Sequence, residues 1–203
     1  MLGSANIIAI TGPSGVGKNT LGSMLKKRLD FIEAKHCTTR SKRSDDVSGF
    51  YRYLSHDEYA ELLAEERFLF SSGDGPEVKK EYGNFYGVLK SDIEDALKES
   101  SDIILYVSYK DLEALEKLKV AGLNIRIVVL KFNDIKKGVL SRISKNKFRN
   151  HSKEDIDKRI KSAVELDKAY KEMVEKCADS IIYTDVLNKN AMYKKVCKDL
   201  SLK

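Results

Sequence analysis

Near its N-terminus the chain reads Gly12-Pro13-Ser14-Gly15-Val16-Gly17-Lys18-Asn19-Thr20. This run follows the apolar, β-branched residues 7–11, which predict a buried strand, and opens residues 20–29, whose apolar positions recur at helical spacing. A glycine-rich turn between a strand and a helix, ending in lysine, is typical of a phosphate-binding loop. The glycines let successive backbone N–H groups converge on one point, where the helix N-terminus adds partial positive charge. We therefore expect the loop to bind a nucleoside triphosphate, with Lys18 at the β- and γ-phosphates.

The residue directly after the lysine departs from the usual pattern. Phosphate-binding loops of this kind carry Ser or Thr there, whereas this chain has Asn19 and then Thr20. Some nucleotide kinases place a Thr at the later position. The Thr20 hydroxyl is therefore the predicted protein contact for Mg²⁺, whose other ligands are mostly water and phosphate oxygens. A glycine-rich turn that binds no nucleotide is the alternative, and the flanking strand and helix disfavour it.

Length and composition exclude several classes of protein. The 203 residues are 42% hydrophobic and 33% charged with 2 Pro, which indicates one domain, or one core with inserted lobes, and not a disordered chain. No apolar run approaches the ~18 residues of a membrane span, and no signal-peptide pattern opens the sequence. The 3 Cys lack metal-ligand spacing, so we expect a reducing cytoplasm. The net charge of +6 permits nucleic acid or anionic small molecules as partners, but no nucleic-acid-binding motif accompanies it.

Strand-like and helix-like segments alternate along the rest of the chain. Further strands are predicted at 34–39, 102–107, 125–131 and 180–183, and further helices at 55–66, 91–99, 111–119, 153–177 and 189–200. Ser55 and Glu58 form a predicted capping box, and Ser91 is a predicted N-cap. This alternation favours an α/β fold with a parallel sheet. Residues 35–90 and the basic stretch 145–153 break the pattern, so we expect them to form lobes on the sheet core.

A second anion site is predicted after the second strand. Arg40 ends the run Thr38-Thr39-Arg40, and Arg43 follows three residues later. Tyr51 lies in Gly49–Tyr53, and Tyr86 lies in Tyr82-Gly83-Asn84-Phe85-Tyr86-Gly87. Two guanidinium groups and two phenols suit a phosphate monoester, because Arg binds it bidentately and Tyr adds neutral donors. Taken singly, each of these residues has a surface or packing role as its alternative.

In order and spacing, these motifs resemble the guanylate kinase family from residue 7 to about residue 200. The matching motifs are G-P-S-G-V-G-K, T-T-R-x-x-R and G-N-F-Y-G, followed by a long helix with Arg159. The resemblance implies a P-loop α/β fold with a five-stranded parallel sheet in the order 2-3-1-4-5, flanked by helices. It also implies a core of residues 1–34, 91–137 and 159–203, a lobe for the nucleoside monophosphate at 35–90, and a lid at 138–158. The implied activity is Mg²⁺-dependent phosphoryl transfer from ATP to GMP.

The resemblance also implies roles for individual residues. Arg40, Arg43, Tyr51 and Tyr86 would hold the acceptor phosphate, while Lys18, Arg142 and Arg159 would surround the transferring group. Lys145, Lys147 or Arg149 would replace one further lid arginine. Such residues would act by positioning and by offsetting charge on the phosphoryl oxygens, and lid closure would exclude water.

The site for the base departs from the family. Glu77 lies nine residues before Tyr86, as the guanine-reading Glu does, but residues 70–76 look inserted, and an exposed loop glutamate is the alternative. His36 replaces a serine of the base site and is expected to bind the acceptor, where it can donate to guanine O6. Val88 replaces a residue with a hydroxyl group, and the third strand ends in Leu105-Tyr106-Val107-Ser108 without the family's two aspartates.

Three other functions follow from these departures or from the charge. The bacterial ribose 1,5-bisphosphate kinases share the Y-G-V and the strand without aspartates, although they usually lack the second arginine, here Arg43. A non-catalytic guanylate-kinase-like interaction module is disfavoured by the intact phosphate-binding loop. A nucleic-acid binder has only the positive charge in its support.

Overall fold

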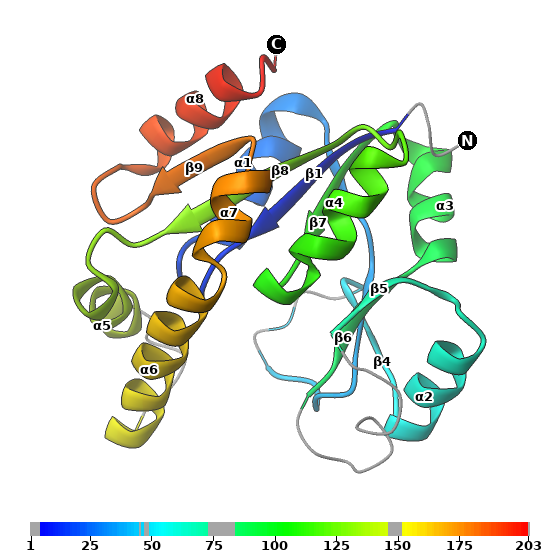
Figure 1. Cartoon of the computed structure of the whole chain (residues 1–203), viewed down its shortest axis with the longest axis horizontal. Helices are drawn as coiled ribbons and strands as arrows, with labels where there is room; N and C mark the ends of the chain where they lie inside the picture. Colours follow the sequence, from blue (N-terminus) through cyan, green and yellow to red (C-terminus); the bar gives the residue numbers. More distant parts are fainter. Residues whose placement is uncertain (1–4, 45, 47–48, 73–83, 146–151, 203) are drawn as a thin grey trace.

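The computed structural model describes residues 5–44, 46, 49–72, 84–145 and 152–202. Its central sheet contains β1 (Asn6–Thr11), β2 (Ile32–Glu33), β7 (Asp102–Tyr106), β8 (Ile125–Lys131) and β9 (Ser180–Tyr183). These strands are all parallel and lie in the order β2-β7-β1-β8-β9 (Figure 1). Counted along the chain among the strands of this sheet, the order is 2-3-1-4-5, which confirms the prediction.

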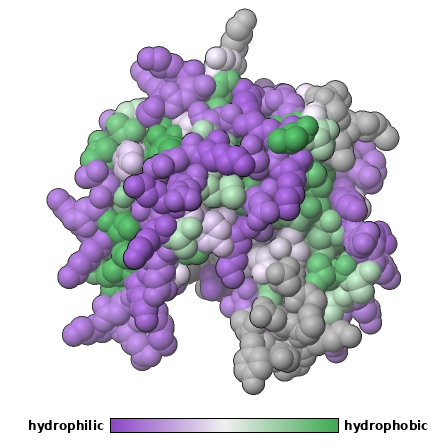
Figure 2. Space-filling view, viewed as in Figure 1, coloured by the Kyte–Doolittle hydropathy of each residue, from purple (hydrophilic) through white to green (hydrophobic). Residues whose placement is uncertain are grey.

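Helices cover both faces of the central sheet because successive side chains of β1 point to opposite sides. Ile8 and Ile10 pack with α1 (Lys18–Leu29) and α8 (Lys189–Asp199) on one face. Ile7 and Ala9 pack with α3 (Lys90–Glu99), α4 (Leu112–Val120) and α7 (Lys171–Cys177) on the other. The outer surface is mainly hydrophilic on the face that Figure 2 shows. Within the described ranges, no helix is both long enough and apolar enough to cross a bilayer.

A second sheet occupies much of the segment predicted as an inserted lobe. It contains β3 (His36–Thr38), β4 (Tyr51–Tyr53), β5 (Phe68–Ser71) and β6 (Tyr86–Leu89) in the order β4-β3-β6-β5. β3 pairs with β4 in parallel and with β6 antiparallel. Tyr59 of α2 (His56–Ala64) packs with buried residues from this sheet, so the lobe has its own small core. The strand predicted at 34–39 is shorter, β3 at 36–38, and belongs to this second sheet, whereas the strand that joins the central sheet at this point is β2, just before the predicted range.

Two predicted helix boundaries were tested by local contacts. Ser55 and Glu58 form the predicted capping box at the start of α2. Ser91 is not an N-cap: α3 begins at Lys90, directly after β6, and the Lys90 N–H donates to the Arg67 carbonyl at 2.9 Å. The strand therefore leads into the helix before Ser91 is reached.

The long helix predicted at 153–177 is two helices, α6 (Lys153–Ala169) and α7. The break is at Tyr170, whose ring stacks on Tyr109 with 6.1 Å between the centroids. Tyr109 belongs to a short 3₁₀ turn, Tyr109–Asp111, that precedes α4. α6 packs against α5 (Ile135–Lys145), and the two extend from the end of the central sheet where β1 and β8 finish (Figure 1).

Candidate functional site

The predicted phosphate-binding loop connects β1 to α1 as expected. Gly12, Gly15 and Gly17 have φ angles of 141°, 78° and 113°, a region that residues with a Cβ rarely adopt. At Gly12 a Cβ would also collide with the Leu130 carbonyl oxygen of β8. Because α1 begins at Lys18, its first N–H groups lie at the end of the loop, where a helix terminus attracts anions.

Lys18 lies inside this loop. Its ammonium donates to the carbonyl oxygens of Gly12 at 2.6 Å and Pro13 at 3.2 Å. Burial of the group lowers the Lys18 pKa from 10.5 to about 8, because desolvation disfavours the charged form. The lysine is therefore already next to the point on which the loop converges.

Arg159 brings α6 to the same place. Its Nη1 donates to the Ser14 hydroxyl at 2.9 Å, so a cation from the second half of the chain lies at the loop. Arg142 belongs to α5, but its side chain is outside the described part of the chain, as are the side chains of Lys145, Lys147 and Arg149.

A cavity of about 560 Å³ adjoins the loop and is lined by Gly17 and Thr20 and by the segments that follow β8 and β9. The Asp185 carboxylate joins these two segments by accepting from the N–H groups of Asn133 at 2.8 Å and Asp134 at 3.0 Å. Our sequence reasoning missed this part of the site. The available signal was the position of residues 184–188 directly after a parallel strand, where ligands of α/β proteins commonly bind.

Thr20 is partly buried and lines this cavity, one position beyond the exposed Asn19. Among the described residues, no group of three or more His, Cys, Asp or Glu side chains is placed to hold a metal ion. A hydroxyl beside a polyphosphate site nevertheless fits Mg²⁺, which commonly takes few protein ligands and obtains the rest from phosphates and water.

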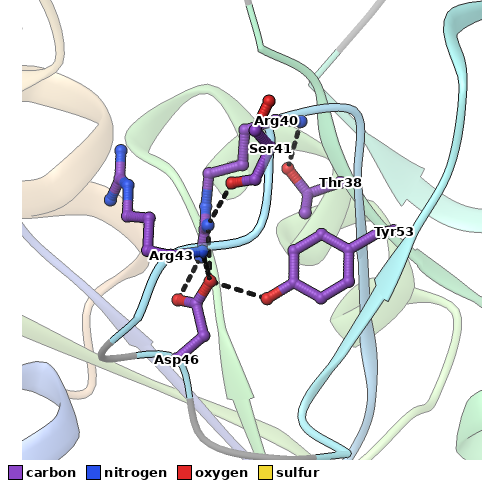
Figure 3. Close-up of polar contacts among 6 residues, drawn as sticks. All are labelled: Thr38, Arg40, Ser41, Arg43, Asp46 and Tyr53. Atoms are coloured by element: carbon purple, nitrogen blue, oxygen red, sulfur yellow. Dashed lines mark hydrogen bonds and ion pairs between the residues drawn. The ribbon is translucent and has the colours of Figure 1, made fainter.

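The predicted acceptor site is built around Arg40, whose side chain is 5% exposed. Its Nη1 and Nη2 donate to the two carboxylate oxygens of Asp46 at 2.7 and 2.5 Å (Figure 3). Asp46 also accepts from the Tyr53 hydroxyl at 2.6 Å and from the Arg43 backbone N–H at 2.7 Å. These bonds hold the pKa of Asp46 well below its usual range. Neither Asp46 nor Tyr53 was among the predicted site residues, because an aspartate among Ser and Lys in a polar stretch has no distinguishing pattern.

The other predicted phosphate contacts surround Arg40 to different degrees. The Tyr51 ring lies under the guanidinium, 4.6 Å from its centre to Arg40 Cζ. Tyr86 is 37% exposed on β6, and it lies near enough to add to the raised pKa of Tyr51, which is due mainly to burial of that phenol. The Arg43 side chain is exposed and points away from Asp46 (Figure 3). The structure therefore gathers Arg40, Tyr51 and Tyr86 and leaves Arg43 at the rim.

The predicted contacts for the base are less well placed. His36 is 4% exposed; its Nδ1 lies 2.9 Å from the Ala34 carbonyl oxygen, and its Nε2 lies 2.8 Å from the Tyr106 carbonyl oxygen and 3.1 Å from the Tyr106 backbone nitrogen. In this arrangement both ring nitrogens contact backbone groups, and His36 connects β3 to β7. Glu77 lies outside the described residues.

The other positions that depart from the family also have structural roles. Val88 is fully buried in the central core. The Tyr106 hydroxyl donates to Glu33 at 2.6 Å. Ser108 caps the turn before α4, accepting from the Lys110 N–H and donating its own N–H to Asp111.

Comparisons with known proteins place the chain in one family. The guanylate kinase family model matches residues 4–200. A guanylate kinase of Clostridium perfringens (strain SM101) is 31% identical over 159 residues, which are 77% of this chain and 68% of that protein.

Solved structures share the fold. The guanylate kinase of Anaplasma phagocytophilum has a TM-score of 0.65 at 15% identity, over 97% of this chain and 85% of that chain. A shikimate kinase of Acinetobacter baumannii has a TM-score of 0.50 at 16% identity, over 98% of this chain and 96% of that chain. With its sheet order and phosphate-binding loop, the chain belongs to the guanylate kinase family.

Proposed function

We propose that this protein transfers the γ-phosphoryl group of ATP to GMP, giving ADP and GDP. The observation that carries the proposal is the presence, in a guanylate kinase family chain, of a phosphate-binding loop and a separate Arg–Tyr anion site. A kinase for a phosphorylated acceptor needs these two sites, one for the donor and one for the phosphate it extends.

The donor site lies at the carboxyl ends of β1, β8 and β9. Residues Gly12–Thr20 bind the phosphates of ATP, and the cavity lined by Thr20 and the segments after β8 and β9 accepts the nucleoside. Lys18 turns from the loop carbonyls to the β- and γ-phosphates, and Arg142 and Arg159 add positive charge from α5 and α6. Phosphoryl transfer depends mainly on such positioning and charge.

Mg²⁺ would be held by the Thr20 hydroxyl together with the ATP phosphates. When bound, it supplies charge neutralisation at the β- and γ-oxygens. The donor set on this chain is limited, so the phosphates must provide most of the ligands.

The acceptor site uses Arg40, Arg43, Tyr51 and Tyr86 for the phosphate of GMP. We place it in a lobe of residues 35–90, with a lid at 138–158 and a core made of the remaining residues. Closure of the lobe and lid brings the two sites together and excludes water from the transferring group.

Guanine recognition rests on Glu77, whose carboxylate accepts from the N1–H and the exocyclic amine. His36 was assigned to the same base, but both of its nitrogens contact backbone groups in this conformation. With Val88 and Ser108 engaged elsewhere, we expect guanine selectivity of about 5- to 150-fold over adenine, from a carboxylate–base pair worth ~1–3 kcal/mol.

The second candidate is a kinase of the same fold acting on ribose 1,5-bisphosphate, and the loss of polar groups on the base side is the observation behind it. An assay of ADP release with GMP, dGMP, AMP, CMP, UMP and ribose 1,5-bisphosphate separates the two. GMP should give the highest kcat/KM, and Glu77→Gln should reduce its advantage over AMP. If GMP is inert and the bisphosphate is turned over, the second candidate replaces the first.

A further inference from the structure

We infer that Asp46 is a positioning residue for the acceptor phosphate: it holds one edge of Arg40 so that the other edge is presented to the ligand. The inference rests on the proposed acceptor site, because it assigns a task within that site. It arises from a carboxylate found where a phosphate-binding arginine was expected to be available to the ligand (Figure 3).

The geometry of the ion pair determines which edge of Arg40 is used. A guanidinium has five N–H donors. Nη1 and Nη2 each give one to Asp46, and Nη1 gives its second to the Ser41 carbonyl at 2.9 Å. These bonds to Asp46 and Ser41 do not use Nε–H or the second hydrogen of Nη2, which point the same way from adjacent nitrogens. Two parallel N–H groups of this kind match two oxygens of one phosphate. The Tyr51 hydroxyl also interacts with the guanidinium, so it lies beside the phosphate that this edge would bind.

Asp46 is itself fixed from several directions. Its side chain is 6% exposed, and besides Arg40 it accepts from the Tyr53 hydroxyl and the Arg43 N–H. The Asp46 N–H donates back to the Arg43 carbonyl at 3.2 Å, which closes the turn in both directions. A phosphate that displaced Asp46 from Arg40 would leave a desolvated carboxylate without its ion-pair partner, which is strongly unfavourable. We therefore expect the phosphate to bind the other edge of Arg40 and not to compete with Asp46.

Tyr51 completes the arrangement. Its ring lies against the face of the Arg40 guanidinium, so the group is held both on its face and along one edge. Arg40 N–H donates to the Thr38 hydroxyl at 3.2 Å, which ties the arginine backbone to β3. A group held in this way loses little side-chain entropy when the phosphate binds.

Charge alone predicts the opposite effect of removing Asp46. The carboxylate offsets one of the two arginine charges, so Asp46→Asn makes the site more positive and should strengthen anion binding if only Coulomb attraction matters. If Asp46 acts by orienting Arg40, the same variant should weaken binding. The two accounts differ in sign, which makes the variant decisive.

The experiment measures binding of GMP and of inorganic phosphate by calorimetry, with KM and kcat for GMP and ATP in parallel. Asp46→Asn should weaken both ligands about 10- to 100-fold, the range for a lost hydrogen bond to a charged group, while the ATP KM and kcat stay within about twofold. Asp46→Glu, which retains the carboxylate, should recover most of the loss. Glu61→Gln is the matched control, an exposed carboxylate on α2 of the same lobe, and should change nothing.

Two further variants keep the test valid if Asp46→Asn folds poorly. Tyr53→Phe removes one donor to Asp46 and should raise the GMP KM severalfold. Arg40→Ala combined with Asp46→Asn should bind GMP no more weakly than Arg40→Ala alone, because both changes disable the same contact. Equal or tighter phosphate binding by Asp46→Asn, or additive losses in the double variant, overturns the inference. If the parent neither binds nor phosphorylates GMP, the proposed function fails, and the phosphate measurements still decide the role of Asp46.

Discussion

The guanidinium of Arg159 donates from Nη1 to the hydroxyl of Ser14 at 2.9 Å, and this bond joins α6 to the phosphate-binding loop. The residues are 145 positions apart, so the contact depends on the whole fold. It also places a second cation beside Lys18 at the carboxyl end of β1. The proposed donor site therefore draws on both halves of the chain.

Arg159→Ala should lower kcat by about 10²- to 10³-fold, because a donor to the charge that develops on the transferring group is lost. The melting temperature should hardly change, since the contact with Ser14 is exposed. The comparison is with Lys158→Ala, which removes an exposed cation of the same helix paired with Glu154. Equal kcat values for the two variants would remove Arg159 from the site.

Lys18→Ala should abolish phosphoryl transfer, with a loss in kcat at least as large as that of Arg159→Ala, while the protein remains folded. Among the described residues, the side chain donates hydrogen bonds to the loop carbonyls of Gly12 and Pro13 alone, so its removal costs little packing. Turnover and the circular dichroism spectrum check both parts, with Lys27→Ala on the exposed side of α1 as the control. Near-normal turnover of Lys18→Ala would refute the assigned donor site.

The lowered pKa of Lys18 predicts proton uptake when ATP binds. In the ligand-free protein burial brings this pKa to about 8, so at pH 8.5 a large part of the group is neutral. Bound phosphates favour the ammonium form and raise the pKa again. Calorimetry of ATP binding in two buffers with different ionisation enthalpies should detect this uptake at pH 8.5 and little of it at pH 6.5. Lys18→Met should show none, and an unchanged proton count in that variant would contradict the prediction.

The same shift has a defined sign for stability. Because the folded pKa lies below 10.5, the unfolded chain binds more protons between about pH 8 and 10.5. The contribution of Lys18 to the free energy of unfolding therefore rises with pH across that window.

Alanine substitutions of Arg40 and Arg43 should differ in their effect on protein stability, even though both residues are proposed to bind the acceptor phosphate. Alanine at either position should raise the GMP KM far more than the ATP KM. Arg40→Ala should also destabilise the protein by about 1–3 kcal/mol, since the Asp46 carboxylate loses its ion-pair partner and keeps only the Tyr53 hydroxyl and the Arg43 N–H. Arg43 has an exposed side chain, so Arg43→Ala should leave the denaturation midpoint unchanged. A larger effect of either variant on the ATP KM would show that the two anion sites are wrongly assigned.

The strand, glycine-rich turn and helix of the proposed donor site were predicted correctly because the signal is local. The residues of the turn are adjacent in the chain, and the neighbouring strand and helix have clear apolar periodicity. The central sheet order was implied by the family resemblance and is confirmed. The boundaries were less predictable: the helix breaks at Tyr170, whose ring stacks on Tyr109, a contact that no local pattern encodes.

The acceptor side was predictable only in part because its chemistry depends on contacts between short segments. Arg40 and Tyr51 were recognisable by their motifs, whereas Asp46 gained its role from a turn that folds back on Arg40. His36 was predicted to contact the base because it replaces a serine of the family's base site. In the fold its ring connects two strands of different sheets. Glu77 is outside the described residues, so its role stays a prediction.

His36 provides a pH test of this connection between β3 and β7. Burial lowers its pKa below 6.5 and outweighs the opposing effect of the Tyr106 and Ala34 backbone contacts, so the neutral ring is favoured in the folded protein. Below about pH 6.5 the unfolded chain binds the extra proton, and the free energy of unfolding should therefore fall as the pH drops from 7 to 5.

Urea denaturation at several pH values checks this effect in the parent, in His36→Asn and in His56→Asn as the control histidine. His36→Asn should be less stable at pH 7, because buried backbone groups lose their partner, and its stability should depend less on pH. His56→Asn should keep the slope of the parent. An equal slope in His36→Asn would show that His36 is not the titrating group. The ratio of kcat/KM for GMP and AMP in His36→Asn then separates two roles, since a base-reading His36 would change that ratio and a residue that only joins the two strands would leave it unchanged.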